Sequence, residues 1–400
     1  MLRLRRAGRP GRGRAPGHRR GPAAAVRRLL RQRGAADLPR LRRGASRQGA
    51  ASRLGDALMA APRLIDIHSH FFPHSWPDLS ARFGGDWPWM RHEGARRATV
   101  MIGDRPFRPV YDACWDMAVR LEEMDRHGVD HQIMCATPVL FAYDRPVDQA
   151  AEVARIFNDA AIELREQGRG RIDVLCQVPL QDGDAACREL ERAMAAGHVG
   201  VQIGNHVGDR DLDDESILVF LQHCASLGAA VLVHPWDMIG TGSPRMRDYM
   251  LPWLVGMPAE TQLSILRLIL SGAFERLPRD LRICFAHGGG SFPYLLGRAE
   301  NAWRERDIVR KDCPHPPSHY LDRFHVDAAV FDAGALKLLV DVMGEDRVLF
   351  GTDYPFPLGE KEMGALVLGS TLDDAVKAKI LAGNASRFFG LEERRVLVGA

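Results

Sequence analysis

Two histidines separated by a single residue follow a short apolar run in the stretch LIDIHSH (64–70). His68 and His70 stand at the end of a predicted strand. Because side chains alternate across a β-strand, residues i and i+2 lie on the same face. Two neutral imidazoles side by side gain little from packing, but they are well placed to share one metal ion. Asp66, two residues earlier on the same face, is expected to be structural.

Three further residues of metal-binding type end apolar runs in the same way. His234 follows VLV, His287 follows CFA and Asp353 follows FGT. One histidine at a strand end is more often a hydrogen-bonded structural group, and an aspartate before Tyr-Pro can simply cap a turn. Their joint occurrence favours a metal centre. Imidazoles with one carboxylate suit Zn²⁺, with water in the open position.

The segments that must position these residues alternate between strands and helices. Strands are expected at 63–69, 129–136, 171–180, 199–205, 229–236, 281–288, 324–331 and 347–355, with amphipathic helices such as 116–128 and 184–197 between them. Apolar strands alternating with helices are typical of a parallel sheet covered on both faces. Eight such units in about 340 residues predict a (β/α)₈ barrel. A doubly wound open sheet is the alternative, and no glycine-rich phosphate motif follows the first strand to support it.

Two connections are too long to be plain loops. Residues 71–110 follow the first strand, and residues 237–262 follow the fifth. Both come after the carboxyl end of a strand, where barrel enzymes carry their active sites. The second insertion is rich in Met, Trp and Pro and suits a pocket wall or a subunit contact. Decorative surface insertions are the alternative.

The charge is distributed very unevenly along the chain. Residues 1–58 hold 17 Arg, no Lys and two acidic residues, which leaves 37 basic and 49 acidic residues, about −12, in 59–400. We expect residues 1–58 to be a disordered tail and 59–400 to be one barrel domain. The tail could be a translated upstream region before Met59, a basic segment that touches a polyanion, or a transit peptide. No nucleic-acid partner is expected for the acidic folded part.

Cysteine usage and hydropathy bear on where the protein works. The seven cysteines are dispersed and include no C-x-x-C pair, which favours free thiols in a reducing, cytoplasmic location. No window approaches the roughly 18 uninterrupted apolar residues of a membrane span, so no membrane association is expected.

The motifs IDIHSH, HPWD, AHGGG and GTDYPFP, in this order, resemble those of the amidohydrolase superfamily, and in particular of its metal-dependent, non-hydrolytic decarboxylase branch. The resemblance extends from about residue 63 to about residue 391 and implies an amidohydrolase-type (β/α)₈ barrel. It also implies four ligands to a single Zn²⁺: His68, His70, His234 and Asp353.

Further roles are implied only by this resemblance. His287 would lie beside the metal-bound water and act as an acid/base without ligating. Arg108, in FRP, would clamp a substrate carboxylate, and Arg298, in LLGR, would reach into the active site of the neighbouring subunit of a homodimer. An ordinary helix-surface arginine is the alternative for Arg298. Tyr249 replaces an aromatic residue, often Trp, of the family and should preserve a pocket wall.

The expected activity is the decarboxylation of a small conjugated amino-dicarboxylate, a lyase reaction that needs no organic cofactor. Hydrolytic relatives often bridge two metals with a carboxylated lysine, but this region carries Gln202 and no Lys in 181–236, which favours a mononuclear site. The same site acting on a benzoate-type acid, a lactone or an amide is a second hypothesis. A third hypothesis is a protein that binds nucleic acid through the arginine-rich tract, but it leaves the strand-end residues unexplained.

Overall fold

Eight parallel strands form the centre of the computed structural model, which describes residues 63–391. Hydrogen bonds join them in the order β1, β5, β6, β7, β10, β11, β12, β13. Their bounds are Ile65–Phe71 (β1), His131–Ala136 (β5), Ile172–Cys176 (β6), Gly200–Ile203 (β7), Ala230–Val233 (β10), Ile283–Phe285 (β11), His325–Asp327 (β12) and Val348–Leu349 (β13). All eight predicted strands are present, most of them shorter than predicted. The predicted tail, 1–58, lies outside the described residues, so the predicted domain division stays a prediction.

Backbone hydrogen bonds between β1 and the segment after β13 close the sheet into a barrel. The Ile67 N–H donates to the Phe350 carbonyl over 2.9 Å, and the Asp353 N–H donates to the His68 carbonyl over 2.9 Å. Ser69 and Tyr354 also form a parallel bridge. The (β/α)₈ barrel is therefore confirmed, and closure brings two predicted metal ligands to adjacent positions.

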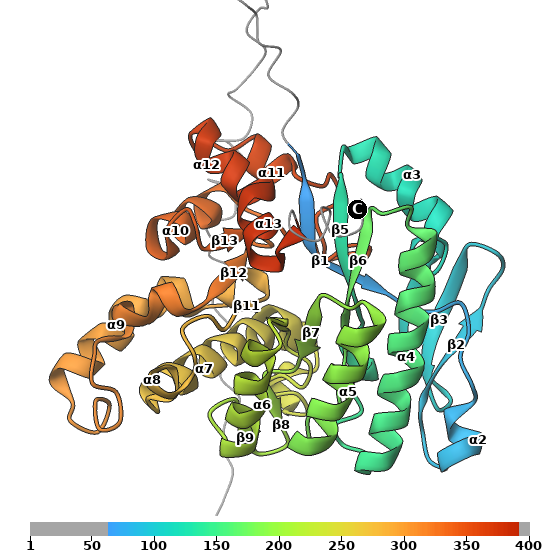
Figure 1. The fold of residues 1–400 in the computed structure, drawn as a ribbon, viewed down its shortest axis with the longest axis horizontal. Helices are drawn as coiled ribbons and strands as arrows, with labels where there is room; N and C mark the ends of the chain where they lie inside the picture. Colours follow the sequence, from blue (N-terminus) through green and yellow to red (C-terminus); the bar gives the residue numbers. More distant parts are fainter. Residues whose placement is uncertain (1–62, 392–400) are drawn as a thin grey trace, which may run out of the picture. The chain divides into compact units, whose positions relative to one another are not determined.

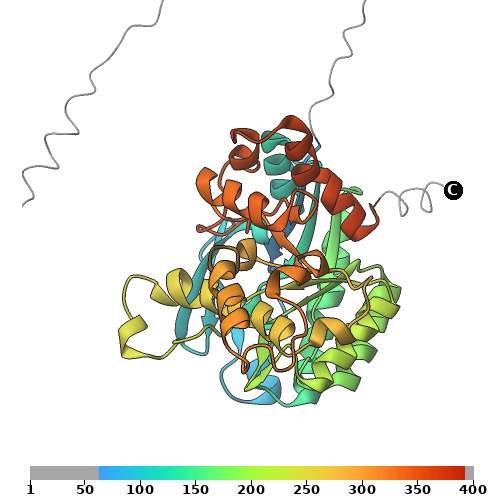
Figure 2. The same cartoon turned by 90° about the vertical axis from the view of Figure 1, so that its left-hand side faces the viewer.

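Helices surround the strands. Figure 1 shows the strands in the centre with α4 and α5 along one side and α9 and α10 on the other, and Figure 2 gives the perpendicular view. The helices are α2 (Leu79–Phe83), α3 (Met117–His127), α4 (Val147–Gln167), α5 (Gly183–Ala196), α6 (Glu215–Ser226), α7 (Met257–Leu270), α8 (Ala273–Arg276), α9 (Phe292–Glu305), α10 (Ala333–Met343), α11 (Ala365–Leu368), α12 (Asp374–Ala378) and α13 (Asn384–Phe389). Helices α3 and α5 match the predicted ranges closely, and α5 is capped by Gly197, whose φ of 112° suits a residue without Cβ. Among the described residues, no helix is both long and apolar enough to cross a membrane.

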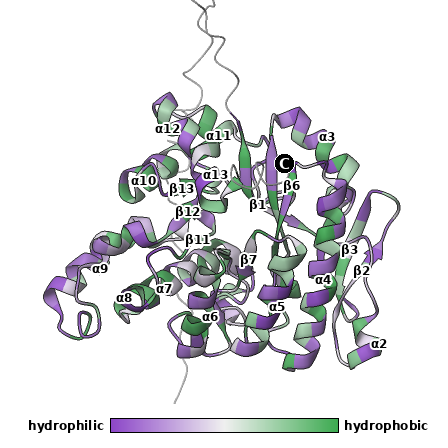
Figure 3. Ribbon diagram, viewed as in Figure 1, coloured by the Kyte–Doolittle hydropathy of each residue, from purple (hydrophilic) through white to green (hydrophobic). Residues whose placement is uncertain are grey.

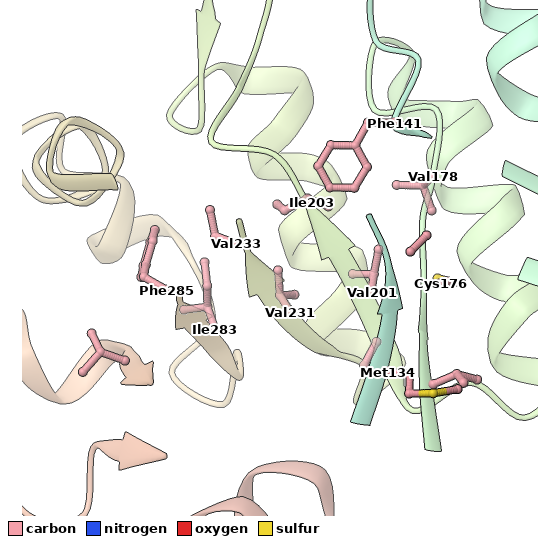
Figure 4. Packing of buried hydrophobic residues seen from close by; sticks show 14 of the residues in the cluster. Met134, Phe141, Cys176, Val178, Val201, Ile203, Val231, Val233, Ile283 and Phe285 are labelled. Atoms are coloured by element: carbon pink, nitrogen blue, oxygen red, sulfur yellow. The ribbon is translucent and has the colours of Figure 1, made fainter. Parts of the chain in front are cut away.

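Apolar side chains fill both sides of the sheet. Val201, Ile203, Val231 and Val233 alternate along β7 and β10 and belong to the cluster between strands and helices (Figure 4). The intervening residues, such as Leu232, form an inner cluster that α13 joins through its phenylalanines. The helices carry purple and green bands in Figure 3, as expected for elements with one face on the sheet. The polar side chains at the carboxyl ends of the strands therefore stand on a packed apolar interior.

The two long insertions both shape the space above the barrel. Residues 71–110 form α2 and a three-stranded antiparallel sheet of β2 (Pro88–His92), β3 (Arg97–Ile102) and β4 (Arg105–Tyr111). The second insertion ends in a π-helical turn, Pro252–Gly256, and α7 begins at Met257, earlier than predicted. Residues of both insertions line the same cavity, so the pocket-wall interpretation is confirmed and a purely decorative role is wrong. A subunit contact stays a prediction.

Candidate metal centre

Four side chains that are distant in the sequence meet at the carboxyl end of the barrel. His68 and His70 come from β1, His234 directly follows β10, and Asp353 lies in the segment after β13. One ligand atom from each lies within 4.8 Å of the others, and no further group of three or more His, Cys, Asp or Glu side chains in residues 63–391 is gathered in this way. The three imidazoles are buried. The predicted convergence is confirmed.

Hydrogen bonds behind the cluster orient two of these imidazoles. His68 Nδ1 lies 2.6 Å from Asp327 Oδ2, and His234 Nδ1 lies 2.8 Å from its neighbouring Pro235 carbonyl. Because both acceptors require an N–H, the proton is assigned to Nδ1 and the lone pair to Nε2 in each ring. His234 Nε2 is buried without a hydrogen-bond partner in the described residues. His68 Nε2 lies 3.1 Å from His70 Nε2, a close approach that a shared cation explains.

The electrostatics suit ligand chemistry. Burial lowers the pKa of His70 to about 4 and holds that of His234 well below its usual range. Burial alone would raise the pKa of Asp353, but the neighbouring His287 and His70 hold it well below its usual range. The neutral imidazoles of His70 and His234 and the ionised carboxylate of Asp353 are the forms that bind metals. The donor set therefore fits a single divalent ion.

His287 lies beside this group without belonging to it. Its Nε2 is 3.8 Å from Asp353 Oδ2, and its ring centroid is 5.0 Å from that of His234. Its Nδ1 is buried and has no hydrogen-bond partner in the described residues. His287 (φ 54°) and Asp353 (φ 59°) both adopt the left-handed backbone region, which non-glycine residues occupy at a cost and which often marks functional sites. The acid/base role of His287 stays a prediction.

Asp327 is the main residue of the site that the sequence reasoning missed. It ends β12, orients His68, and accepts the Gly288 N–H over 2.9 Å, so it fixes the loop that carries His287 as well. A signal was present, because Asp327 ends the apolar run FHVD just as the other site residues end theirs. Its contribution is to position ligands rather than to bind the ion.

Asp66 has the structural role that the sequence reasoning gave it. It is fully buried and accepts hydrogen bonds from Thr352 Oγ1 over 2.7 Å and Gln132 Nε2 over 3.0 Å. These bonds tie β1 to β5 and to the segment that follows β13. Asp66 therefore stabilises the barrel beneath the site.

A cavity of about 1490 Å³ opens above the metal ligands. It reaches His70, His234, His287 and Asp353, and its walls are mostly apolar and aromatic. Pockets of this kind hold small ligands and orient them with a few polar groups. The candidate metal centre thus forms the floor of a binding pocket.

Arg108 is the predicted substrate clamp, and its side chain lies in this cavity. Its guanidinium carbon is 4.3 Å from the centre of the Phe356 ring, which in turn stacks on His70 with ring centroids 5.1 Å apart. Burial lowers the pKa of Arg108, although an arginine stays charged at neutral pH. No hydrogen bond or ion pair occupies its guanidinium among the described residues, so its donors are available to a ligand.

Arg298 and Tyr249 do not line the cavity of their own chain. Arg298 is exposed on α9, so its predicted role depends on a second copy of the chain and stays a prediction. Tyr249 is 86% exposed, and the prediction that it preserves the pocket wall is wrong for the single chain. Positive φ angles at Tyr249 and Met250 redirect this loop, and Met250 and Trp253 line the cavity instead.

Comparisons with known proteins agree with this geometry. A family model described as Amidohydrolase matches residues 65–391. This chain belongs to the amidohydrolase family. It is 41% identical over 337 residues to 2-amino-3-carboxymuconate-6-semialdehyde decarboxylase of Dictyostelium discoideum, covering 83% of this chain and 93% of the relative. The decarboxylase of the same name from Caenorhabditis elegans is 31% identical, with 76% and 88% covered.

A solved structure shares the fold of this amidohydrolase. The 2,6-dihydroxybenzoate decarboxylase from Rhizobium superposes with a TM-score of 0.66 at 25% identity, over 83% of this chain and all of that one. The two relatives and the Rhizobium protein are all named as decarboxylases. The chain is thus a decarboxylase-type member of the amidohydrolase family.

Proposed function

We propose that this protein removes one carboxylate of 2-amino-3-carboxymuconate 6-semialdehyde as CO₂ and yields 2-aminomuconate 6-semialdehyde. The observation that carries the proposal is the 41% identity, over 93% of its length, to an enzyme named for that substrate. The site supports it, because the candidate metal centre, the side chain of Arg108 without an ion-pair partner and the unligated His287 share a single pocket.

Arg108 binds a carboxylate of the substrate. A guanidinium can donate two parallel hydrogen bonds to one carboxylate, a geometry that lysine cannot reproduce. Phe356 lies between this guanidinium and the candidate ligands, because it contacts Arg108 and stacks on His70. The apolar walls exclude water around the conjugated chain, which strengthens this ion pair.

Zn²⁺ is the proposed ion, because three imidazoles and one carboxylate match its preferences. When bound, it supplies Lewis acidity to an oxygen at the pocket floor. Asp327 and the Pro235 carbonyl keep the ligand nitrogens of His68 and His234 turned toward that floor. No organic cofactor is part of the proposal.

His287 moves the proton. It is protonated at Nε2 by solvent, which supplies the one proton that the reaction consumes, and it delivers this proton to the substrate carbon that bears the departing carboxylate. The bond from that carbon to the carboxylate then breaks, its electron pair restores the conjugated system, and CO₂ leaves. Positioned acid/base assistance of this kind contributes on the order of 10²–10⁴-fold.

The proposal also covers the oligomeric state of the protein, its location in the cell and its pathway. The chain would act as a homodimer in which Arg298 of one protomer reaches the pocket of its partner. All seven cysteines are free thiols and six are buried, a state that a reducing cytoplasm preserves. The reaction would belong to tryptophan catabolism through the kynurenine pathway or to nitroaromatic catabolism.

Decarboxylation of a benzoate-type acid is the second candidate. The likeness to the Rhizobium 2,6-dihydroxybenzoate decarboxylase favours it, because that enzyme has the same fold. Such a substrate carries one carboxylate and would need Arg108 alone. Hydrolysis of a lactone or an amide at the same metal centre is a further alternative.

The test is an assay of CO₂ release with parallel metal analysis. Purified protein loaded with Zn²⁺ is given the amino-carboxymuconate semialdehyde, 2,6-dihydroxybenzoate or a simple lactone. We expect one ion per chain, and CO₂ release with loss of near-UV absorbance from the first substrate only. CO₂ release from the benzoate alone would replace the proposal with the second candidate, and lactone hydrolysis alone would replace it with the third.

A further inference from the structure

An irregularity in the hairpin of β3 and β4 lies directly beside Arg108. Arg108 pairs with Val100 and Arg105 pairs with Ile102, but between these pairs only Pro106 finds a partner on β3. Phe107 is therefore an extra residue on β4. Such a β-bulge sets two residues of one strand against one of the other and re-aims the side chains around it.

The bulge changes the direction of Arg105. In a regular strand, residues three apart point to opposite faces of the sheet. Here their partners Val100 and Ile102 are two apart on β3, so Arg105 and Arg108 share one face. The cavity is consistent with this direction, since Ile102 and both arginines line it, together with Phe107 and Pro109. The two attachment points are roughly 6.6 Å apart along the strand, at about 3.3 Å per residue.

Neither guanidinium has a hydrogen-bond or ion-pair partner among the described residues, although that of Arg108 stacks on Phe356. Arg108 is half-buried near the ligands, whereas Arg105 is exposed where the cavity opens. Many other arginines of the described chain hold carboxylates in ion pairs, as Arg165 holds Asp173. Two unpaired arginines on one face of a pocket wall form a site for an anion with two charges.

We propose that Arg105 is a second carboxylate-binding residue, which makes the pocket selective for dicarboxylates within a single chain. This inference rests on the proposed function and names the residue that selects its substrate class. Arg108 holds the inner carboxylate, and Arg105 receives the outer one as the substrate enters. A monocarboxylate engages Arg108 only.

The test compares Arg105→Gln and Arg105→Lys with the control Arg97→Gln. Arg97 lies on β3 three residues before Val100, is exposed on the opposite face, and does not line the cavity. Calorimetric titrations of the Zn²⁺-loaded protein use phthalate as the dicarboxylate and benzoate as the monocarboxylate. The decarboxylation rate is measured in parallel.

We expect Arg105→Gln to weaken phthalate binding roughly tenfold, the lower range for a hydrogen bond to a charged group, and benzoate binding less than about twofold. KM for the substrate should rise by a similar factor while kcat changes little. Arg105→Lys should retain part of the phthalate affinity and its salt dependence, and Arg97→Gln should match the wild type.

The inference is overturned if the wild type binds phthalate no more tightly than benzoate, or if Arg105→Gln behaves as Arg97→Gln does. Equal losses for both probes would also overturn it, because they indicate general damage to the pocket. Failure of the proposed function is distinct. In that case the wild type releases no CO₂ from the amino-carboxymuconate semialdehyde, whatever the phthalate titrations give.

Discussion

Two histidine–aspartate pairs, one fully buried and one partly buried, stand at opposite ends of the barrel. At the carboxyl ends of the strands, His68 donates to Asp327 over 2.6 Å, and at the amino end of β5, His131 lies 3.0 Å from Asp173. Arg165 also binds Asp173 over 3.0 Å and closes that network. The pairs are chemically alike and differ in what the second ring nitrogen of the histidine faces.

This difference distinguishes a pair that belongs to the candidate metal site from a pair that only stabilises the fold. The second nitrogen of His68 faces His70 and Asp353 at the floor of a cavity. The second nitrogen of His131 is buried and has no partner in the described residues. A histidine–aspartate pair thus orients a metal ligand only where other donors converge on the free nitrogen.

Removing a metal-ligand side chain should have the largest effect on metal content and activity. His234→Ala should lose most of the bound metal and abolish CO₂ release, because the remaining three side chains leave the ion undercoordinated. His131→Ala is the matched control and should retain the metal. Elemental analysis of both purified variants, with the decarboxylation assay, checks this. Full metal content in His234→Ala would remove His234 from the ligand set.

Removing the proposed proton carrier should cost nearly as much activity without touching the metal. His287→Ala should lower kcat by on the order of 10²–10⁴-fold with metal content near that of the wild type. Steady-state kinetics and elemental analysis on one preparation measure both quantities. Loss of the ion would instead make His287 a ligand.

Disrupting the two aspartates compares the ends of the barrel directly. Asp327→Asn keeps the size of the side chain but weakens its hold on His68, so metal affinity or activity should fall about 10–100-fold. Asp173→Asn should leave both near wild type. Competition with a chelator gives the affinities. Equal effects of the two variants would contradict the assignment of Asp327 to the metal site and of Asp173 to a purely structural role.

The smallest effect concerns stability and pH. Burial alone would raise the pKa of Asp173, but hydrogen bonds with His131 and Arg165 lower it below its ordinary value. A carboxyl with a lowered folded-state pKa stabilises the fold fully above its ordinary pKa, and this contribution is lost as pH falls from the ordinary pKa through the lowered one.

Asp173→Asn should therefore cost about 1–3 kcal/mol at pH 7 and flatten the loss of stability below about pH 5. Urea unfolding midpoints at pH 7 and pH 4 measure this, with the exposed Asp374→Asn as control. A variant that loses stability with acid as steeply as the wild type would contradict the assignment.

The strand ends explain how much of this site could be predicted. His68, His234 and Asp353 each end an apolar run, and a closed parallel barrel brings all such ends to one rim. Their convergence therefore follows from the strand pattern alone. The pairing of His68 with Asp327 does not, because it joins residues 259 positions apart whose contact depends on the relative twist of β1 and β12.

The positions of the two insertions were predictable from the sequence, but their backbone conformations were not. Their lengths located them over the pocket, yet the bulge at Phe107 and the turn at Tyr249 depend on local backbone choices that hydrophobic periodicity does not record. This is why Tyr249 was wrongly placed in the wall and why Arg105 was not singled out.

The backbone bond from Asp353 to His68 has a consequence for folding. It is part of the seam where the last strand of the barrel meets the first, and both residues also supply ligand atoms. A chain whose seam is open cannot present the complete donor set. Occupancy by the ion and ring closure are thus thermodynamically linked, so metal concentration should tune resistance to unfolding of the whole barrel.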